Sequence, residues 1–372
     1  MKEIVFWQEA LSIHRAPVIR ELSRLAGLRV SAVSFNAVSS ARQAMGWDTP
    51  DYGQAHLEIF DPSHWQRAAE AYRNADVHVF AGFGAWPGLR EVQAHLAPIS
   101  DAMMFVLTEP WDDRGFKGFL RLLRAGRRVK RLGPHLSGVL PCGPRAKQQL
   151  QSFRPLRSTP IYDFGYFVDA SAPVTQSPAD SQRLIFVGAL AEWKRPLLLI
   201  RVLARLQHLS WHLDMYGQGA QSSEVHREIE LHSLEGRIHV HDYRPYHAIR
   251  EEIAASDLLI LPSAHDGWGA VINEALMDGT RVVVSDAAGA SDLVTHEMLG
   301  GRFRSGDRSS LEDALRSALA FHHDHQTCSA IRTWADKTIS PTAAAEYLKT
   351  ILLTLPKPVT APWKEIAPSL GD

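Results

Sequence analysis

The chain has 372 residues, of which 45% are hydrophobic and 22% charged, as expected for an ordinary soluble globular protein. This length is enough for two α/β domains, each with its own core. A formal net charge of -1 argues against a general binder of nucleic acid or other polyanions. Because residues 1–169 are net positive and the rest net negative, we expect the two halves to meet different partners.

The cysteine content and the apolar stretches indicate the compartment. Cys142 and Cys328 lie far apart and belong to no Cys-x-x-Cys or Cys/His motif, so we expect unpaired thiols in a reducing environment. The N-terminal sequence MKEIVFWQEALSIHR is too polar for a signal peptide. No apolar stretch approaches the roughly 18 residues of a membrane span. These features predict a cytoplasmic protein.

The N-terminal half alternates short apolar runs with amphipathic helical patterns. This alternation is typical of β-α-β units and a parallel sheet. Proline near several helix starts suits the first helical turn. We predict strands at 2–7, 28–35, 77–82, 102–109 and 137–143, and helices at 16–27 and from near Pro62, Pro87, Phe116 and Pro144.

Residues 170–182, ASAPVTQSPADSQ, lack apolar periodicity and are predicted to link two domains. Beyond this linker the alternation restarts, so we predict an α/β GT-B-like architecture of two facing Rossmann-like domains with a cleft between them. The domains would span 1–169 and 183–340, and residues 341–372 would carry a helix that crosses back to the first domain. Strands are predicted at 183–190, 211–217, 237–243 and 257–263, and helices at 194–207, 222–234 and 245–256.

Two carboxylates, Asp266 and Glu274, are separated by seven residues across a glycine-rich turn. A buried apolar strand precedes them, and a helix is predicted to begin at Trp268 or Gly269 and to end at Gly279. Both acids would then face a cleft at the carboxyl end of the strand, where open α/β sheets bind ligands. Taken singly, Asp266 is better explained as a helix N-terminal carboxylate and Glu274 as a solvated helix residue. The functional interpretation is preferred because both acids stand in the full segment 261–294.

Three segments together resemble the retaining GT-B glycosyltransferases of family 4: VGALAEWK at 187–194, DMYGQG at 214–219 and the segment 261–294. The resemblance covers roughly residues 183–320. The family pattern is an acid, seven residues, a glutamate, a small-residue turn and a further acid. The matching positions are Asp266, Glu274, Ala288, Gly289 and Asp292.

The resemblance implies a nucleoside-diphosphate sugar as donor, bound by the C-terminal domain. Glu274 would accept hydrogen bonds from the two ribose hydroxyls, and Asp266 would contact hydroxyls of the transferred sugar. Main-chain amides at a helix N-terminus would favour the phosphates. The residues that would supply these amides are Gly267, Trp268, Gly269 and Ala270.

Lys194 follows a predicted strand by a short loop that also contains Gly188. Its ammonium would neutralise the diphosphate as the glycosidic bond breaks. Members of the family usually have an arginine near the position of Ala189, which this chain lacks. We expect Arg195 or Arg15 to compensate.

Gly217 and Gly219 follow another predicted strand. They would let the backbone approach the nucleotide closely, or they form a simple turn. Tyr243 and Arg244 stand where related proteins bind the base, although the usual glycine of the family is missing there.

The N-terminal domain is predicted to supply the acceptor side. His14 and Arg15 replace the glycine pair of the family at the end of the first strand, and Thr108 and Glu109 replace its histidine. His14 is predicted to act in the cleft or to be structural. Glu109 would orient a hydroxyl, act as a base, or cap the following helix.

The segment Arg114–Arg131 contains eight cationic residues and no acid, with Phe116, Phe119, Leu120 and Leu123 at helical spacing. A helix on an anionic membrane surface has this character. The alternative is that the helix packs this apolar stripe against the sheet. The cations would also suit the diphosphate of a lipid-linked acceptor.

Two patterns bear on metals. In FHHDH at 321–325, adjacent histidines on a helix diverge, so a solvated helix end is preferred over a metal site. The chain also has no Asp-x-Asp triplet, the metal-diphosphate signature of the other large glycosyltransferase fold. We therefore expect no metal and no cofactor.

The resulting prediction is a retaining glycosyltransferase that moves a sugar from a nucleoside-diphosphate donor to a hydroxyl of a glycan or lipid-linked saccharide, in surface polysaccharide or glycoconjugate synthesis. It would work in the cytoplasm, peripherally at the membrane. The family resemblance implies a front-face displacement in which the departing diphosphate helps to deprotonate the acceptor. The alternatives are a sugar-nucleotide epimerase on the same scaffold and a non-catalytic sugar-nucleotide-binding protein.

Overall fold

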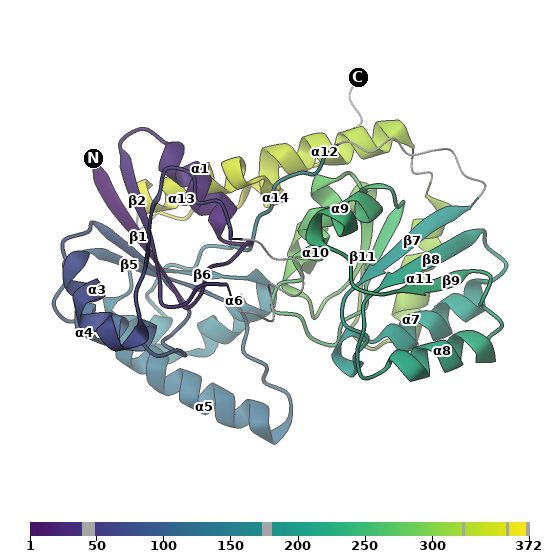
Figure 1. The fold of residues 1–372 in the computed structure, drawn as a ribbon, viewed down its shortest axis with the longest axis horizontal. Helices are drawn as coiled ribbons and strands as arrows, with labels where there is room; N and C mark the ends of the chain where they lie inside the picture. Colours follow the sequence, from purple (N-terminus) through teal and green to yellow (C-terminus); the bar gives the residue numbers. More distant parts are fainter. Residues whose placement is uncertain (39–48, 173–180, 322–323, 355–356, 370–372) are drawn as a thin grey trace. The chain divides into compact units, whose positions relative to one another are not determined.

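The computed structural model divides into two compact α/β units (Figure 1). The first comprises residues 1–167 and 341–362, and the second comprises residues 168–340 and 363–372. Residues 173–180 of the predicted linker and the two adjacent histidines at 322–323 lie outside the described residues. The structure describes residues 1–38, 49–172, 181–321, 324–354 and 357–369.

The first unit contains a parallel sheet with the strand order β3-β2-β1-β4-β5-β6. The order reverses between β1 and β4, which lie side by side although two strands separate them in sequence. Five of the six strands match the sequence prediction. The sixth, β3, has only four residues and no apolar run, so the pattern missed it. The strands are β1 (Lys2–Gln8), β2 (Leu28–Ser34), β3 (His56–Ile59), β4 (Val77–Ala81), β5 (Met103–Thr108) and β6 (Gly138–Pro141).

Helices cover both faces of this sheet. One face carries α3, α4, α5 and α6, and α1 lies with α13 in the same unit (Figure 1). The C-terminal helix α13 thus belongs to the unit formed by the N-terminal residues. The helices are α1 (Ala16–Arg24), α3 (Trp65–Ala71), α4 (Leu89–Leu96), α5 (Gly115–Leu132), α6 (Gly143–Ser152) and α13 (Pro341–Thr354).

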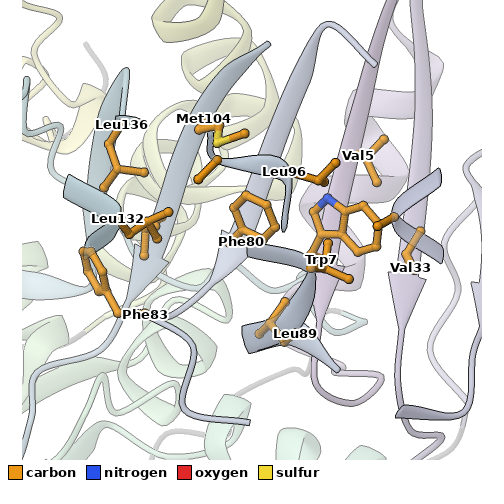
Figure 2. Close-up of a cluster of buried hydrophobic side chains, with 14 of the residues drawn as sticks. Val5, Trp7, Val33, Phe80, Phe83, Leu89, Leu96, Met104, Leu132 and Leu136 are labelled. Atoms are coloured by element: carbon orange, nitrogen blue, oxygen red, sulfur yellow. The ribbon is translucent and has the colours of Figure 1, made fainter. Parts of the chain in front are cut away.

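Trp7 on β1 lies at the centre of the core of the first unit (Figure 2). Its ring stacks on Phe80 of β4 at 6.1 Å between centroids. Its indole N–H donates to Nδ1 of His78 at 3.1 Å. Burial lowers the pKa of His78 to about 4, which keeps the imidazole neutral and its Nδ1 free to accept. The buried Trp7 N–H is therefore satisfied within the core.

The second unit repeats the arrangement, with the order β12-β11-β10-β7-β8-β9 and all strands parallel. Read from the other edge, the order is β9-β8-β7-β10-β11-β12, which corresponds strand by strand to the order in the first unit. Both sheets have the Rossmann strand order, so the predicted α/β fold with two Rossmann-like sheets is confirmed. The strands are β7 (Gln182–Val187), β8 (Trp211–Tyr216), β9 (Ile238–His241), β10 (Leu258–Leu261), β11 (Arg281–Ser285) and β12 (Gly300–Phe303).

The helices of the second unit also form two layers. Buried apolar residues of α7, α8 and α11 pack with one face of the sheet, and α10 packs with α9 and α12. A short helix, α14, follows near the C-terminus. The bounds are α7 (Pro196–Leu203), α8 (Ser222–Leu231), α9 (Tyr246–Ala254), α10 (Val271–Met277), α11 (Arg308–Ala320), α12 (His325–Ile339) and α14 (Pro362–Glu365).

A buried ion pair fixes the start of the second unit. Arg250 on α9 donates from Nε and Nη2 to the two carboxylate oxygens of Asp278, at 2.9 and 2.8 Å. Nη2 also donates to the carbonyl of Asp169 at 3.0 Å, and the Ser171 amide donates to Asp278 at 2.8 Å. The segment that enters the unit is thus tied to α9 and to the end of α10.

Removing the guanidinium in Arg250→Ala would leave the Asp278 carboxylate buried with its charge uncompensated. We expect the free energy of unfolding of the second unit to fall by about 3–5 kcal/mol. Arg244→Ala is the matched control, because Arg244 pairs with Glu252 at 2.5 Å from a much more exposed position and should cost at most about 1 kcal/mol. Urea unfolding followed by fluorescence measures both, and equal losses would contradict the assignment.

Candidate functional site

The strand order locates a ligand crevice in the second unit. β7 and β10 are neighbours in the sheet, but β8 and β9 lie between them in sequence. The loops that leave the carboxyl ends of such a pair run in opposite directions, and the crevice between them is the usual ligand site of an open α/β sheet. The loop after β7 carries Lys194, and the loop after β10 carries Asp266.

Lys194 and Asp266 meet across this switch point. Nζ of Lys194 lies 2.6 Å from a carboxylate oxygen of Asp266, and both side chains are largely shielded from solvent. The amide of Ala264 donates to the carbonyl of Trp193 at 2.7 Å and so joins the two loops directly. Gly188 lies beneath the lysine stem, since a Cβ there would be 3.4 Å from the lysine Cε.

Asp266 is held by the next loop as well. Its amide donates to the carbonyl of Ala287 at 3.2 Å, and it forms a parallel bridge with Ala288. The residue that caps the N-terminus of α10 is Ala270. The alternative interpretation of Asp266 as a helix-capping carboxylate is therefore wrong. Its carboxylate instead faces Lys194.

Glu274 lies in the first turn of α10 and is only 6% exposed. The helix begins at Val271, slightly later than predicted, because Gly269 has a φ of 87°, which no residue of a right-handed helix adopts. The alternative interpretation of Glu274 as a solvated residue is wrong. Burial raises its pKa, and the charge of Arg250 opposes this rise.

The turn between Asp266 and Glu274 contains main-chain amides that have no protein acceptor among the described residues. Within the described structure, the amides of Gly267, Trp268, Gly269 and Ala270 donate to no protein acceptor. The Trp268 side chain itself is buried and donates to Oδ1 of Asn273 at 2.7 Å. Of Trp268, only the main-chain N–H is therefore left for a ligand. An ammonium, two carboxylates and these amides can bind a molecule that carries both an anion and hydroxyl groups.

Arg195 leaves the same loop in the left-handed conformation, with φ at 56°. Its Nη1 donates to the hydroxyl of Ser305 at 3.0 Å. The guanidinium lies so close to Gly306 that a Cβ there would be 2.7 Å from Nη1. This position is at the loop after β12, and a role of Arg195 at phosphates stays a prediction.

Gly217 and Gly219 line a surface hollow of about 450 Å³ at the carboxyl ends of β8 and β9. A Cβ at Gly217 would lie 2.0 Å from the carbonyl oxygen of Gly188, and one at Gly219 would lie 2.4 Å from that of Leu190. Glycine is therefore required by the close approach of the loop after β7. The two glycines also form part of the wall of this hollow.

Tyr243 and Arg244 differ in their surroundings. Tyr243 is 47% exposed, and its hydroxyl donates to the carbonyl of Gln218, a residue of the hollow, at 3.4 Å. Arg244 pairs with Glu252 and lies over the ring of Tyr216 at 5.1 Å. Tyr243 thus borders the hollow, whereas Arg244 is engaged by neighbouring side chains.

Asp292, the last acid of the family pattern, contacts the C-terminal segment. One of its carboxylate oxygens lies 2.9 Å from Nζ of Lys364 and accepts from the Trp363 indole at 3.3 Å. This acid thus holds the end of the chain on the second unit.

In the first unit, Tyr166 brings two predicted residues together. Its ring stacks on His14 at 5.9 Å between centroids, and its hydroxyl donates to Glu109 at 2.7 Å. The residue that caps α5 is Arg114, so Glu109 does not cap that helix. Sequence reasoning missed Tyr166, because it lies in an irregular segment with no periodic pattern to mark it.

Arg15 and Cys142 adjoin the same cluster. Burial raises the pKa of Tyr166 well above its usual range, and the nearby Cys142 and Glu109 add to this rise while Arg15 opposes it. Burial likewise raises the pKa of the Cys142 thiol. Nε and Nη1 of Arg15 are buried and have no hydrogen-bond partner among the described residues. Cys142 and Cys328 are both free thiols.

The described residues bear on two further questions, whether the chain holds a metal ion and whether it crosses a membrane. No group of three or more His, Cys, Asp or Glu side chains in these ranges is arranged to hold a metal ion. None of the helices in the same ranges is both long enough and apolar enough to cross a bilayer.

Comparison with known proteins places these residues in a family context. Residues 168–331 match the family described as glycosyl transferases group 1. This part of the chain is similar to that family. It contains Lys194, Asp266 and Glu274, so the crevice at the switch point belongs to the matched region.

The relatives are similar over this domain rather than over their whole length. The D-inositol 3-phosphate glycosyltransferase of Corynebacterium diphtheriae is 26% identical over 182 residues, which cover 47% of this chain and 43% of the relative. The glycogen synthase of Halorhodospira halophila is 30% identical over 165 residues, covering 42% and 34%. The chain thus spans less than half the length of these relatives.

Solved structures extend the likeness to nearly the whole chain. Anabaena HepE in complex with UDP matches with a TM-score of 0.67 at 18% identity, over 95% of this chain and 99% of HepE. The lipopolysaccharide outer core galactosyltransferase WaaB matches with a TM-score of 0.68 at 14% identity, over 94% and 98%. HepE has also been solved with UDP-glucose. At these identities the likeness establishes the GT-B fold.

The buried Glu274 predicts a pH-dependent stability. Because its folded-state pKa is raised, the wild type should lose stability as pH rises from the unfolded value of about 4.3 through the folded value. Glu274→Gln removes this ionisation, so we expect the variant to be more stable at neutral pH, with the difference vanishing in acid. Urea unfolding across pH measures the effect. The exposed control Glu230→Gln should stay within about 0.5 kcal/mol throughout, and a Glu274→Gln variant less stable than the wild type at neutral pH would contradict the argument.

Proposed function

We propose that the protein is a retaining glycosyltransferase that transfers a sugar from a nucleoside-diphosphate donor to a hydroxyl of a glycan or lipid-linked saccharide. The observation that carries this proposal is the shielded contact of Lys194 with Asp266 at the switch point, with Glu274 buried nearby. The group 1 domain and the UDP and UDP-glucose complexes of HepE support it. Surface polysaccharide or glycoconjugate synthesis is the setting we propose.

The donor would replace the contact between Lys194 and Asp266 with contacts of its own. Its diphosphate takes the lysine ammonium and the amides of the turn from Gly267 to Ala270, which donate to no protein group. Asp266 is then released to accept from hydroxyls of the sugar. Glu274 accepts from the two ribose hydroxyls, and these bonds favour the ionised form that burial alone disfavours.

The base would enter the hollow at the carboxyl ends of β8 and β9. This hollow is bordered by Gly217, Gly219 and Tyr243, and its wall contains both donors and acceptors on Gln218 and Asp242. Its volume of about 450 Å³ is within the range of small-molecule sites. A nucleotide that runs from this hollow to Lys194 crosses the loop after β7.

In the transfer, the bond between the anomeric carbon and the diphosphate oxygen breaks, and the acceptor oxygen bonds to the same face of that carbon. The acceptor proton passes to the departing diphosphate oxygen. Lys194 neutralises the charge that develops on this oxygen, so positive charge from the chain takes the place of a metal ion. Retention of the anomeric configuration follows from attack on the same face.

We assign the acceptor side to the first unit. Glu109 and His14 both contact Tyr166, and Glu109 lies at the exposed end of this cluster. A carboxylate there is able to orient an acceptor hydroxyl by accepting its proton in a hydrogen bond. Arg15 supplies positive charge next to Tyr166.

Lys194→Ala removes the charge that stabilises the leaving diphosphate. We expect kcat to fall about 10²–10³-fold, the usual effect of removing one such transition-state donor, with Lys194→Arg partly active. The exposed control Lys337→Ala should leave the rate unchanged. Transfer from a labelled donor measures these effects. A rate for Lys194→Ala near that of the wild type would remove this residue from the site.

A panel of labelled nucleotide sugars, with and without saccharide acceptors, separates the proposal from its alternatives. Acceptor-dependent transfer or slow donor hydrolysis supports a transferase, an isomerised donor sugar indicates an epimerase, and binding alone indicates a non-catalytic protein. NMR of the anomeric proton in the product tests retention. Activity that survives a chelator supports the metal-independent route, and loss of activity on chelation contradicts it.

We also propose that the protein binds peripherally to anionic membranes through α5. This helix has two apolar faces: one is buried and contains Ala125, Val129 and Leu132. The other points away from the unit, so the alternative that this stripe packs against the sheet is wrong. Its exposed side chains are Phe116 at 76%, Phe119 at 55%, Leu120 at 36% and Leu123 at 49%.

The charge on α5 supports an anionic surface. Asp112 pairs with Arg114 at 2.8 Å and with Arg121 at 2.9 Å, so two of the eight cations share one carboxylate. The other cations form no ion pair with an acid in the described ranges. They are Lys117, Arg124, Arg127, Arg128, Lys130 and Arg131.

Replacing Phe116 and Phe119 together by serine removes two side chains that would enter the bilayer. We expect binding to anionic vesicles to weaken at least about tenfold, because each inserted aromatic contributes on the order of 1.5–3 kcal/mol. Co-sedimentation measures the effect. The control replaces Ile59 and Leu231, which are also exposed, by serine. Binding that is indifferent to anionic lipid, or an equal loss in the control, would contradict the proposal.

A further inference from the structure

A second concave site lies in the first unit and shares no residue with those assigned to donor and acceptor. It is a groove of about 240 Å³ between α4 and the C-terminal part of α5. Apolar side chains, among them Phe83, Ala97 and Leu132, form its floor. Four basic side chains line it: Arg90, Arg128, Arg131 and His135.

The protein balances only part of the positive charge in this groove. Nε and Nη2 of Arg90 both donate to Glu91, at 2.9 and 2.6 Å. Arg128 and Arg131 have no acidic partner in the parts of the chain that the structure describes, and no carboxylate lines the groove. Cations gathered on a concave surface create a positive potential that attracts an anion.

The floor belongs to the rigid core rather than to a loose surface loop. Phe83 and Leu132 are members of the buried cluster around Trp7, and Figure 2 shows them at one side of it. Gln93 of α4 donates to the carbonyl of Gly82 at 2.7 Å and so fixes the loop that carries Phe83. A ligand would thus meet a preformed apolar surface beneath a charged rim.

We propose that this groove binds a phosphate monoester, with the phosphate on the cations and the adjoining carbon atoms on the apolar floor. Two guanidinium groups on one helix suit a dianionic phosphate, because each presents a planar pair of N–H donors to its oxygens. The volume is below the roughly 300 Å³ at which drug-sized sites begin, which fits a head group rather than a whole nucleotide.

A monoester could reach the groove from two sources. One is a phospholipid head group, because Arg128 and Arg131 lie one to two turns beyond the exposed apolar residues of α5. The other is a soluble sugar or glycerol phosphate. The groove shares no residue with Lys194, Asp266, Glu274 or Glu109, so its function and the proposed transfer are tested separately.

The first experiment compares vesicles of phosphatidylcholine mixed with either phosphatidic acid or phosphatidylglycerol at matched surface charge. Only phosphatidic acid presents a monoester. We expect the full-length protein to prefer phosphatidic acid about tenfold or more, and Arg128→Gln with Arg131→Gln to abolish this preference. Arg124→Gln with Arg127→Gln is the matched control, since it removes the same charge from α5 outside the groove.

The second experiment titrates glycerol 3-phosphate and inorganic sulfate into lipid-free protein by calorimetry. If glycerol 3-phosphate binds saturably, and the Arg128/Arg131 variant loses this binding while the control keeps it, the groove binds a soluble monoester. If the protein prefers phosphatidic acid vesicles but does not bind glycerol 3-phosphate, the groove binds a lipid monoester. The rate of donor hydrolysis is measured for each variant as well. An unchanged rate shows that the variant is folded, and it tests the proposed transfer separately from ligand binding in the groove. Equal losses in both variants, or no preference for a monoester in either experiment, would overturn the inference.

Discussion

The contact between the Lys194 ammonium and the Asp266 carboxylate joins two loops that leave the second sheet in opposite directions. Two opposite charges in a shielded crevice satisfy each other while no ligand is bound. They also become available together when a ligand brings its own anion and hydroxyls. The hydrogen bond from Ala264 to Trp193 and the bridge from Asp266 to Ala288 hold both loops in place. The chemistry proposed for the donor depends on this tie.

Around that contact, burial separates structural from functional roles. Trp268 directs its indole into the core, so it contributes packing and leaves only its amide to the turn. Glu274 is as buried as a core residue. Because burial raises its pKa, an ionised carboxylate at this position lowers the stability of the fold at neutral pH. A charge kept where it is costly is typical of a binding site. Asp278, by contrast, is fully compensated by Arg250 and has a structural role.

The first unit uses the same sheet order for different purposes. Its carboxyl-end cluster is organised by Tyr166, which contacts both His14 and Glu109. Its helix α5 has an outward face of aromatic and aliphatic residues and a set of unneutralised cations. These features support the contacts with anionic surfaces and ligands that we propose, and they agree with the uneven division of charge along the sequence.

From the sequence alone, most strands and the two-unit α/β class were predictable, because apolar periodicity is a local pattern. The spacing of Asp266 and Glu274 is local as well, and the donor-side roles of these residues stay a prediction. Strands β3, β11 and β12 were not predicted, and β3, β12 and Tyr166 lack such a pattern. Only the tertiary structure decided that Lys194 meets Asp266, that Glu274 is buried, and that the stripe of α5 faces outward. These depend on strand order and on which helix face packs on the sheet, and both are set by contacts between residues far apart in the chain.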